Sequence, residues 1–289
     1  MTLPLDEACY ADHAAVEQVT LVENVRLARD TFRLRFHAAE IARRILPGQF
    51  LMVRLAAGND PLLARPLALY DTVLDALGNP VGIDVVYLVV GKLTGALARL
   101  SPGDKLTVWG PLGNGFSPRP TQHLLMVAGG IGQTPFLALA RSYLQKRRYG
   151  DSTPPPSDVR RVTLCYGARS ADYLAGIADF SALGVDVRVS TNDGSAGHHG
   201  LVTDLVEPLL AESPAAHVVC CGPEPMMHAV AEQCARHEVQ CEVSLETPMA
   251  CGLGICFSCV TRLRDDSGEW DYRRTCVEGP VFDAKRIVW

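Results

Sequence analysis

The first third of the chain shows short runs of alternating hydrophobic and polar positions, which predict a β-rich domain. Residues 16–25 and 31–36 alternate in this way and are separated by turn signals. A Pro-Gly turn at residues 47–48 precedes another apolar strand, and residues 84–90 form an apolar run typical of a buried strand. Several short strands with frequent turns indicate a barrel, which we place at residues 14–118.

Residues 119–237 follow a different pattern, in which apolar runs of strand length alternate with helical or loop stretches. The run at residues 123–128 leads through a glycine-rich turn into a helical stretch over residues 136–146. Further apolar runs lie at residues 162–166, 185–190 and 217–221. This alternation predicts an α/β domain with a parallel sheet and helices on its faces.

The last segment, residues 238–289, contains four cysteines whose spacing predicts a [2Fe–2S] cluster. Cys251, Cys256 and Cys259 follow the pattern C-x4-C-x2-C, and Cys276 comes after sixteen further residues. Ferredoxin-type clusters begin with this spacing, and the two glycines between the first two cysteines suit a tight loop around sulfide. A zinc site and chance clustering among ten cysteines are the alternatives. The segment is too short to bury much surface, so we expect the cluster to hold it together.

Composition and charge narrow the functional classes. An apolar fraction of 48% with 20% charged residues is that of a globular protein with a substantial core. The net charge of −5, with no basic run longer than Lys146-Arg147-Arg148, argues against nucleic acid as a partner. No apolar run reaches the length of a membrane span, and residues 1–18 lack the apolar core of a signal peptide. We therefore expect a cytoplasmic protein.

Two turns after predicted strands of the α/β domain indicate a dinucleotide site. Gly129, Gly130 and Gly132 lie between a strand and a helix, where glycine lets the backbone approach a pyrophosphate. The Cys-Gly-Pro turn at residues 221–223 has a similar position. Ligands of open α/β sheets gather beyond the carboxyl ends of strands, so the two turns support each other. The alternatives are a tight turn without a ligand and an ordinary helix start.

Taken in order, these motifs resemble those of the ferredoxin reductase superfamily, and more closely the electron-transfer subunit of NAD-linked dihydroorotate dehydrogenases. The resemblance covers about residues 15–289 and is most specific at residues 110–116, 125–134, 221–227, 244–246 and 276–289. It implies a FAD-binding β-barrel at 14–118, a Rossmann-like nicotinamide-binding α/β domain at 119–237 and a small [2Fe–2S] domain at 238–289.

The function that the resemblance implies is electron transfer in pyrimidine biosynthesis. A catalytic partner subunit carrying FMN would oxidise dihydroorotate to orotate, and its electrons would pass through [2Fe–2S] and FAD to NAD+. The implied assembly is a heterotetramer. A flavin can exchange a hydride with nicotinamide and single electrons with an iron–sulfur cluster, so this chain needs no catalytic acid or base.

The resemblance also assigns residues to cofactors. For FAD these are Arg65, Pro66, Leu67, Ala68, Val86, Tyr87, Leu88, Leu93 and Thr94. For the dinucleotide phosphates and the nicotinamide side they are Gly129, Gly130, Gly132, Cys221, Gly222 and Pro223, and the metal ligands are Cys251, Cys256, Cys259 and Cys276. Ala68, Leu88 and Leu93 replace a hydroxyl residue, an arginine and a glycine of the family pattern, which predicts altered flavin contacts.

Two other functions are compatible with the same motifs. Related subunits serve in ferredoxin–NAD(P)H oxidoreductases, hydrogenases and sulfur-metabolism complexes, so the partner could differ. The three replaced flavin positions instead point to a non-catalytic iron–sulfur subunit. The sequence shows no clear basic cluster for a 2′-phosphate, which favours NAD over NADP.

Overall fold

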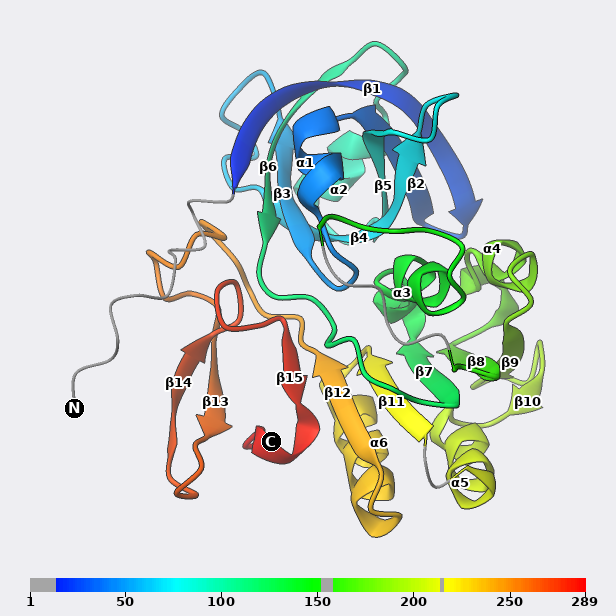
Figure 1. Cartoon of the computed structure of the whole chain (residues 1–289). Coiled ribbons are helices and arrows are strands. Elements are labelled where there is room, and N and C mark those ends of the chain that lie inside the picture. The colour runs from blue at the N-terminus through cyan, green and yellow to red at the C-terminus, as the bar shows by residue number, and fades with distance from the viewer. Residues whose placement is uncertain (1–13, 152–157, 214–215) are drawn as a thin grey trace.

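The chain folds into a β-barrel, an α/β sheet and a small C-terminal hairpin, as the computed structural model shows for residues 14–151, 158–213 and 216–289 (Figure 1). The predicted fold class is confirmed. No helix within these ranges is long and apolar enough to cross a membrane.

The barrel closes in the strand order β1-β2-β5-β4-β3-β6, with every neighbouring pair antiparallel. Its elements are β1 Ala15–Ala28, β2 Thr31–His37, α1 Ala39–Arg44, β3 Phe50–Leu55, β4 Arg65–Leu74, β5 Pro80–Leu88, α2 Lys92–Leu97 and β6 Lys105–Leu112. Alternate side chains of β2 fill the interior, where Leu34 and Phe36 are fully buried. This period of two is the pattern that predicted the barrel.

The second unit is a seven-stranded sheet in the order β10-β9-β8-β7-β11-β12-β15, parallel except for the antiparallel β15. Its strands are β7 His123–Gly129, β8 Arg161–Ala168, β9 Asp186–Thr191, β10 His198–His199, β11 Ala216–Cys221, β12 Gln240–Ser244 and β15 Val281–Asp283. Its helices are α3 Phe136–Tyr143, α4 Ile177–Ser181, α5 Thr203–Glu212 and α6 Glu224–Arg236. Short 3-10 turns lie at η2 Gly130–Gln133, η3 Ala171–Tyr173 and η4 Ala284–Arg286.

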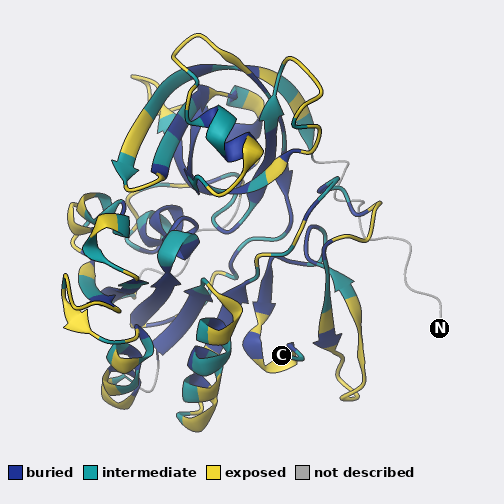
Figure 2. Cartoon of the chain, turned by 180° about the vertical axis from the view of Figure 1, so that it is seen from behind, coloured by how far each residue is buried: buried dark blue, intermediate teal, exposed yellow. Residues whose placement is uncertain are grey.

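Strand β7 is buried along its whole length because helices cover both faces of the sheet. Leu125 and Val127 pack into one core with α5 and α6, whereas Leu124 and Met126 pack into another with α3 and α4. The central strands are therefore buried, while the outer faces of α5 and α6 are exposed (Figure 2). An apolar strand run without alternation is what burial on both faces requires.

Two strands from the last segment, β12 and β15, belong to this sheet. The boundary expected at residue 237 stays a prediction, but the segment after it is shared between the sheet and a separate hairpin. The hairpin consists of β13 Val260–Arg264 and β14 Trp270–Arg274.

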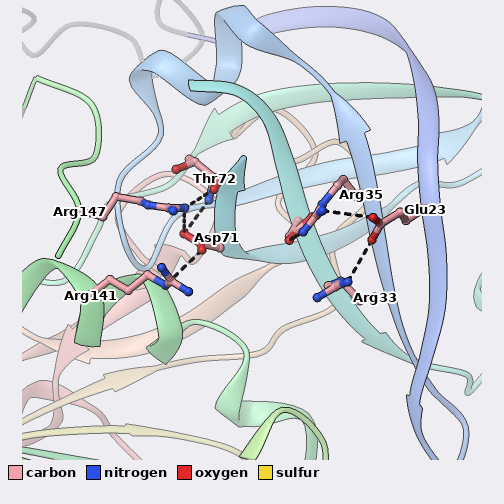
Figure 3. Close-up of polar contacts among 8 residues, drawn as sticks. Glu23, Arg33, Arg35, Asp71, Thr72, Arg141 and Arg147 are labelled. Carbon is pink, nitrogen blue, oxygen red and sulfur yellow. Dashed lines mark hydrogen bonds and ion pairs between the residues drawn. The ribbon is translucent and has the colours of Figure 1, made fainter. Parts of the chain in front are cut away.

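A buried carboxylate on β4 joins the barrel to the α/β unit (Figure 3). Asp71 forms ion pairs with Arg141 of α3 at 3.2 Å and with Arg147 at 2.8 Å, and it accepts a hydrogen bond from the hydroxyl of Tyr149 at 2.7 Å. Burial raises the pKa of the Asp71 carboxyl, and these three partners oppose the rise. The neighbouring Tyr70 donates a 2.6 Å hydrogen bond to Asp179 on α4. We call this set of contacts the β4 clasp.

We expect Asp71→Asn to loosen the seam between barrel and sheet, with a loss of about 3 kcal/mol in the free energy of unfolding, because the Arg147 and Arg141 charges lose their counter-ion. Asp84 provides a matched control, since it is buried on the adjacent strand but pairs at 2.8 Å with Arg35 of β2, so that its ion pair joins two strands of the barrel and does not reach the α/β unit. Amide hydrogen exchange of α3 should accelerate in Asp71→Asn and not in Asp84→Asn. Equal exchange in both variants would contradict a role for Asp71 at the seam.

Candidate functional site

The four clustered cysteines lie in two pairs, Cys259 with Cys276 and Cys251 with Cys256. The sulfurs of Cys259 and Cys276 are 3.2 Å apart. Hydrogen bonds from Ser258, and a further one involving Cys251, lower the pKa of Cys256 to about 6. Among the described residues, no three Cys, His, Asp or Glu side chains gather to hold one metal ion. Two thiol pairs suit a cluster of two irons, each of which takes two of the four thiolates.

The backbone of the cysteine loop is shaped by the two glycines that the sequence singled out. Gly252 and Gly254 have positive φ values of 72° and 79°. A Cβ on Gly252 would lie 2.6 Å from Cγ of Met52, and one on Gly254 would lie 2.5 Å from a methyl group of Val277. Both positions therefore require glycine for conformation and for close packing.

The loop is seated on the outside of the barrel, beside the strand that carries the predicted flavin motif. Trp109 on β6 donates a 3.0 Å hydrogen bond to the carbonyl oxygen of Cys251. Cys259 and Cys276 share a buried apolar cluster with Met52 of β3 and with Ala64. In the sheet register Met52 lies opposite Pro66, and Ala64 directly precedes the motif. The fold thus brings the cysteines and residues 65–68 together.

Asn114 links the barrel to the segment that follows Cys276. Its amide nitrogen donates to the carbonyl oxygens of Glu278 and Val281, at 3.2 and 2.8 Å, and its amide oxygen accepts from the backbone nitrogen of Val281 at 3.0 Å. In the sequence, residues 110–116 are identified only as part of the family resemblance. The side-chain role of Asn114 was missed because its partners lie more than 160 residues away.

The residues predicted for FAD converge from three elements. Residues 65–68 begin β4, residues 86–88 end the neighbouring β5, and Leu93 and Thr94 lie in α2. Arg65 is exposed, and its guanidinium donates to the carbonyl oxygen of Ala64 at 3.0 Å. Contact of these residues with FAD stays a prediction.

Two of these positions have local roles that the sequence alone did not indicate. The Leu93 side chain is buried in the barrel core, so it points away from the exposed Gly91-Lys92 turn. The Thr94 hydroxyl accepts hydrogen bonds from the backbone nitrogens of Val90 and Gly91, both at 3.0 Å, and so fixes this turn.

Tyr87 supplies a test of whether the barrel suits a polar cofactor. Its ring stacks on Phe32 with centroids 6.0 Å apart, and its hydroxyl is buried without a hydrogen-bond partner among the described residues. Burial raises the pKa of this hydroxyl well above its ordinary value, so it stays a neutral donor. A buried hydroxyl without a partner is unfavourable, and polar groups of a bound flavin would relieve that cost.

The two turns predicted to hold the dinucleotide lie side by side, because β7 and β11 are adjacent parallel strands with Ala128 opposite Cys221. A Cβ on Gly132 would lie 2.2 Å from the carbonyl oxygen of Cys221, so this glycine is needed for contact between the turns. Gly130 has a φ of 55° and faces open space. Gly130 is thus the glycine of this turn that leaves room for a ligand.

The second turn is surrounded by polar groups from the next strand. Burial raises the pKa of the Cys221 thiol to about 12, the negative charge of Glu246 adds to the rise, and a hydrogen bond with Ser244 opposes it. The thiol is therefore neutral near pH 7. Gln133, which sequence reasoning missed, is fully buried in the first turn, and neither atom of its amide has a partner among the described residues.

Family models match all three parts of the chain. Residues 18–116 match the oxidoreductase FAD-binding domain, residues 126–232 match the oxidoreductase NAD-binding domain, and residues 246–288 match the iron–sulfur cluster binding domain of dihydroorotate dehydrogenase B. The predicted cofactors, FAD, NAD(H) and an iron–sulfur cluster, are thereby confirmed.

Relatives with the same name cover nearly the whole chain. The dihydroorotate dehydrogenase B (NAD(+)) electron transfer subunit of Desulforamulus reducens is 34% identical over 91% of this chain and 94% of its own length. That of Geobacillus kaustophilus is 35% identical over 94% of this chain and 98% of its own.

Solved structures show the same architecture. A chain of the NADH-dependent reduced ferredoxin-NADP oxidoreductase, described in the context of flavin-based electron bifurcation, superposes with a TM-score of 0.77 at 29% identity, covering 94% of this chain and 90% of that one. The Amycolatopsis cytochrome P450 reductase GcoB shares the fold, with a TM-score of 0.62 at 22% identity over 78% of this chain and 66% of its own.

We expect Cys256→Ala to abolish the iron–sulfur absorption while the flavin absorption is retained, because the cysteine loop packs outside the barrel. Cys234→Ala is the matched control, since Cys234 is buried in the core between the sheet and α6, which none of the four predicted ligands shares. Visible spectra of both purified variants check this. Loss of the cluster in Cys234→Ala, or its retention in Cys256→Ala, would contradict the assigned ligands.

Proposed function

Since the chain belongs to the family of the electron transfer subunit of dihydroorotate dehydrogenase B, we propose that it carries electrons from a dihydroorotate-oxidising partner subunit to NAD+. The observation that supports this most directly is the position of the cysteine loop against β3, next to the flavin motif on β4. In this arrangement a single strand, β3, separates the cysteine loop from the flavin motif on β4, so the path for electrons between the two is short.

In this proposal each cofactor is held by residues in a different part of the chain. The four cysteines hold the cluster, and Trp109 and Gly252 keep their loop on the barrel wall. Residues 65–68, 86–88 and 93–94 hold FAD, whose chemistry when bound is to exchange single electrons on one side and a hydride on the other. The turns at Gly130 and Gly222 hold NAD(H), and the neutral Cys221 thiol places no charge beside the nicotinamide.

The partner in this proposal is an FMN-containing catalytic subunit, and the assembly is a heterotetramer in the cytoplasm. Ile255 and Phe257 of the cysteine loop support a docking surface at the cluster, because their side chains are 76% and 64% exposed. Arg274 lies over the ring of Phe257 with its guanidinium carbon 5.4 Å from the ring centroid. Exposed apolar side chains that lie together are typical of a protein interaction site, and these lie in the loop of the predicted cluster ligands.

We expect Phe257→Ser to weaken binding of the catalytic subunit by about tenfold or more, because an aromatic side chain at an interface centre contributes over ~1 kcal/mol. Leu77→Ser is the control, since Leu77 is 87% exposed on a barrel hairpin. Binding is measured by surface plasmon resonance with the cluster-loaded chain. An equal effect of the two substitutions would place the partner elsewhere.

For the reaction itself, we expect NADH to bleach both the flavin and the iron–sulfur bands of the purified chain under anaerobic conditions. With the catalytic subunit added, dihydroorotate should drive NAD+ reduction, followed at 340 nm. A complex replete in FAD and cluster that fails to do so would exclude dihydroorotate as the electron source. Flavin-free protein that NADH does not reduce would instead indicate a non-catalytic iron–sulfur subunit.

A second candidate function follows from the 29% identical chain of the reduced ferredoxin-NADP oxidoreductase, in which the electron partner differs. Reduction of NADP+ that requires both NADH and reduced ferredoxin, together with co-purification of a reductase subunit instead of a dihydroorotate dehydrogenase, would favour this function.

A further inference from the structure

A basic pocket lies between the barrel and the α/β unit, away from the cofactor residues described above. It has a volume of about 470 Å³ and is lined by Arg43, Leu74, Gly78, Pro80, residues 146–148, Gly150 and Asp151. Arg43 belongs to α1, Leu74 and Pro80 flank the β4–β5 hairpin, and the basic run follows α3. The longest basic run of the sequence therefore faces a concave surface where two units meet, the kind of place where small ligands bind.

The charge of this pocket is largely uncompensated. Its lining contains four cationic side chains and one carboxylate, in a chain whose net charge is −5. Arg147 is held by Asp71 in the β4 clasp. Arg43, Lys146 and Arg148 are exposed, and none of them forms an ion pair with a described carboxylate. Three cations around one hollow repel each other unless an anion lies between them.

The pocket lies near the amino ends of the parallel strands, whereas the predicted nicotinamide site lies at their carboxyl ends. Helix α3 begins just after the carboxyl end of β7 and runs back along the sheet. At its end, the hydroxyl of Tyr143 contacts the Arg119 carbonyl oxygen at 3.3 Å and Nδ1 of His217 at 3.2 Å, and both partners lie near the amino ends of β7 and β11. The basic run that follows is thus on the amino side of the sheet, whereas the turns predicted to hold the dinucleotide lie at the carboxyl ends of β7 and β11.

We propose that this pocket binds a polyphosphate anion, with the phosphates between Arg43, Lys146 and Arg148. Guanidinium groups bind phosphate through two parallel hydrogen bonds, and an ammonium group adds a mobile charge. Leu74 and Pro80 form an apolar wall that can receive the organic part of a nucleoside polyphosphate. Arg147 touches both the pocket and Asp71, so the ligand lies directly behind the β4 clasp.

The test is a calorimetric titration of inorganic tripolyphosphate into the FAD- and cluster-loaded chain at constant ionic strength. Saturating NAD+ is present throughout, so that the dinucleotide site is filled and cannot bind the probe. We expect one binding site per chain, and the double substitution Arg43→Gln/Arg148→Gln should weaken it by about tenfold or more, since two charge-assisted contacts are lost. Binding of a nucleoside triphosphate more tightly than tripolyphosphate would identify the organic part as a further contact.

The control is Arg26→Gln/Arg99→Gln, which removes the same charge from exposed arginines outside the pocket. It should leave the tripolyphosphate affinity unchanged. The proposal is overturned if the wild-type chain shows no binding, if both double variants weaken it equally, or if chloride at matched ionic strength displaces the probe. Far-ultraviolet circular dichroism and retained flavin content verify that each variant is folded.

Discussion

The ion pairs of Asp71 with Arg141 and Arg147 set the position of the α/β unit on the barrel, and the cofactor geometry depends on that position. A hydride moves between nicotinamide and flavin only when the reacting atoms are held about 3–3.5 Å apart. Asp71 lies on β4, six residues beyond Arg65, the start of the flavin motif. One strand therefore holds the flavin residues at one end and the nucleotide-binding unit at the other, so neither can shift without the other.

The cysteine loop uses the same barrel from another side. Gly252 of the loop lies so near Met52 and Leu112 that no larger side chain would fit, Trp109 donates a hydrogen bond to the loop, and the cysteines themselves fill part of the apolar cluster. The cysteine segment is too short to form a core of its own, and it is stabilised instead by packing against apolar side chains of the barrel. Asn114 then fixes the far end of the segment, close to where Cys276 leaves the loop. The distance between the cysteines and the flavin motif is therefore fixed by packing contacts between parts of the chain that are far apart in the sequence.

Much of this organisation could be predicted from local patterns. The alternation in β2, the buried run of β7 and the spacing of the cysteines each depend on nearby residues, so the sequence carries them directly. The orientation of Leu93 could not be predicted, because it depends on which face of α2 meets the barrel. Gly132, Asn114 and the sharing of β12 and β15 depend on partners distant in the chain. Local sequence alone indicates only a phosphate-binding turn at Gly132 and a surface turn at Asn114, because it does not show the distant partners that these residues contact.

The two outermost strands of the large sheet are its shortest. At one edge β10 has two residues, and at the other β15 has three. An unpaired sheet edge is a template onto which a second molecule can add a strand, and truncated edge strands remove most of that template. Few backbone groups are therefore left at either edge for a second molecule to pair with. A protein that exchanges electrons with other proteins can consequently meet them at high concentration with little tendency to self-associate through its backbone.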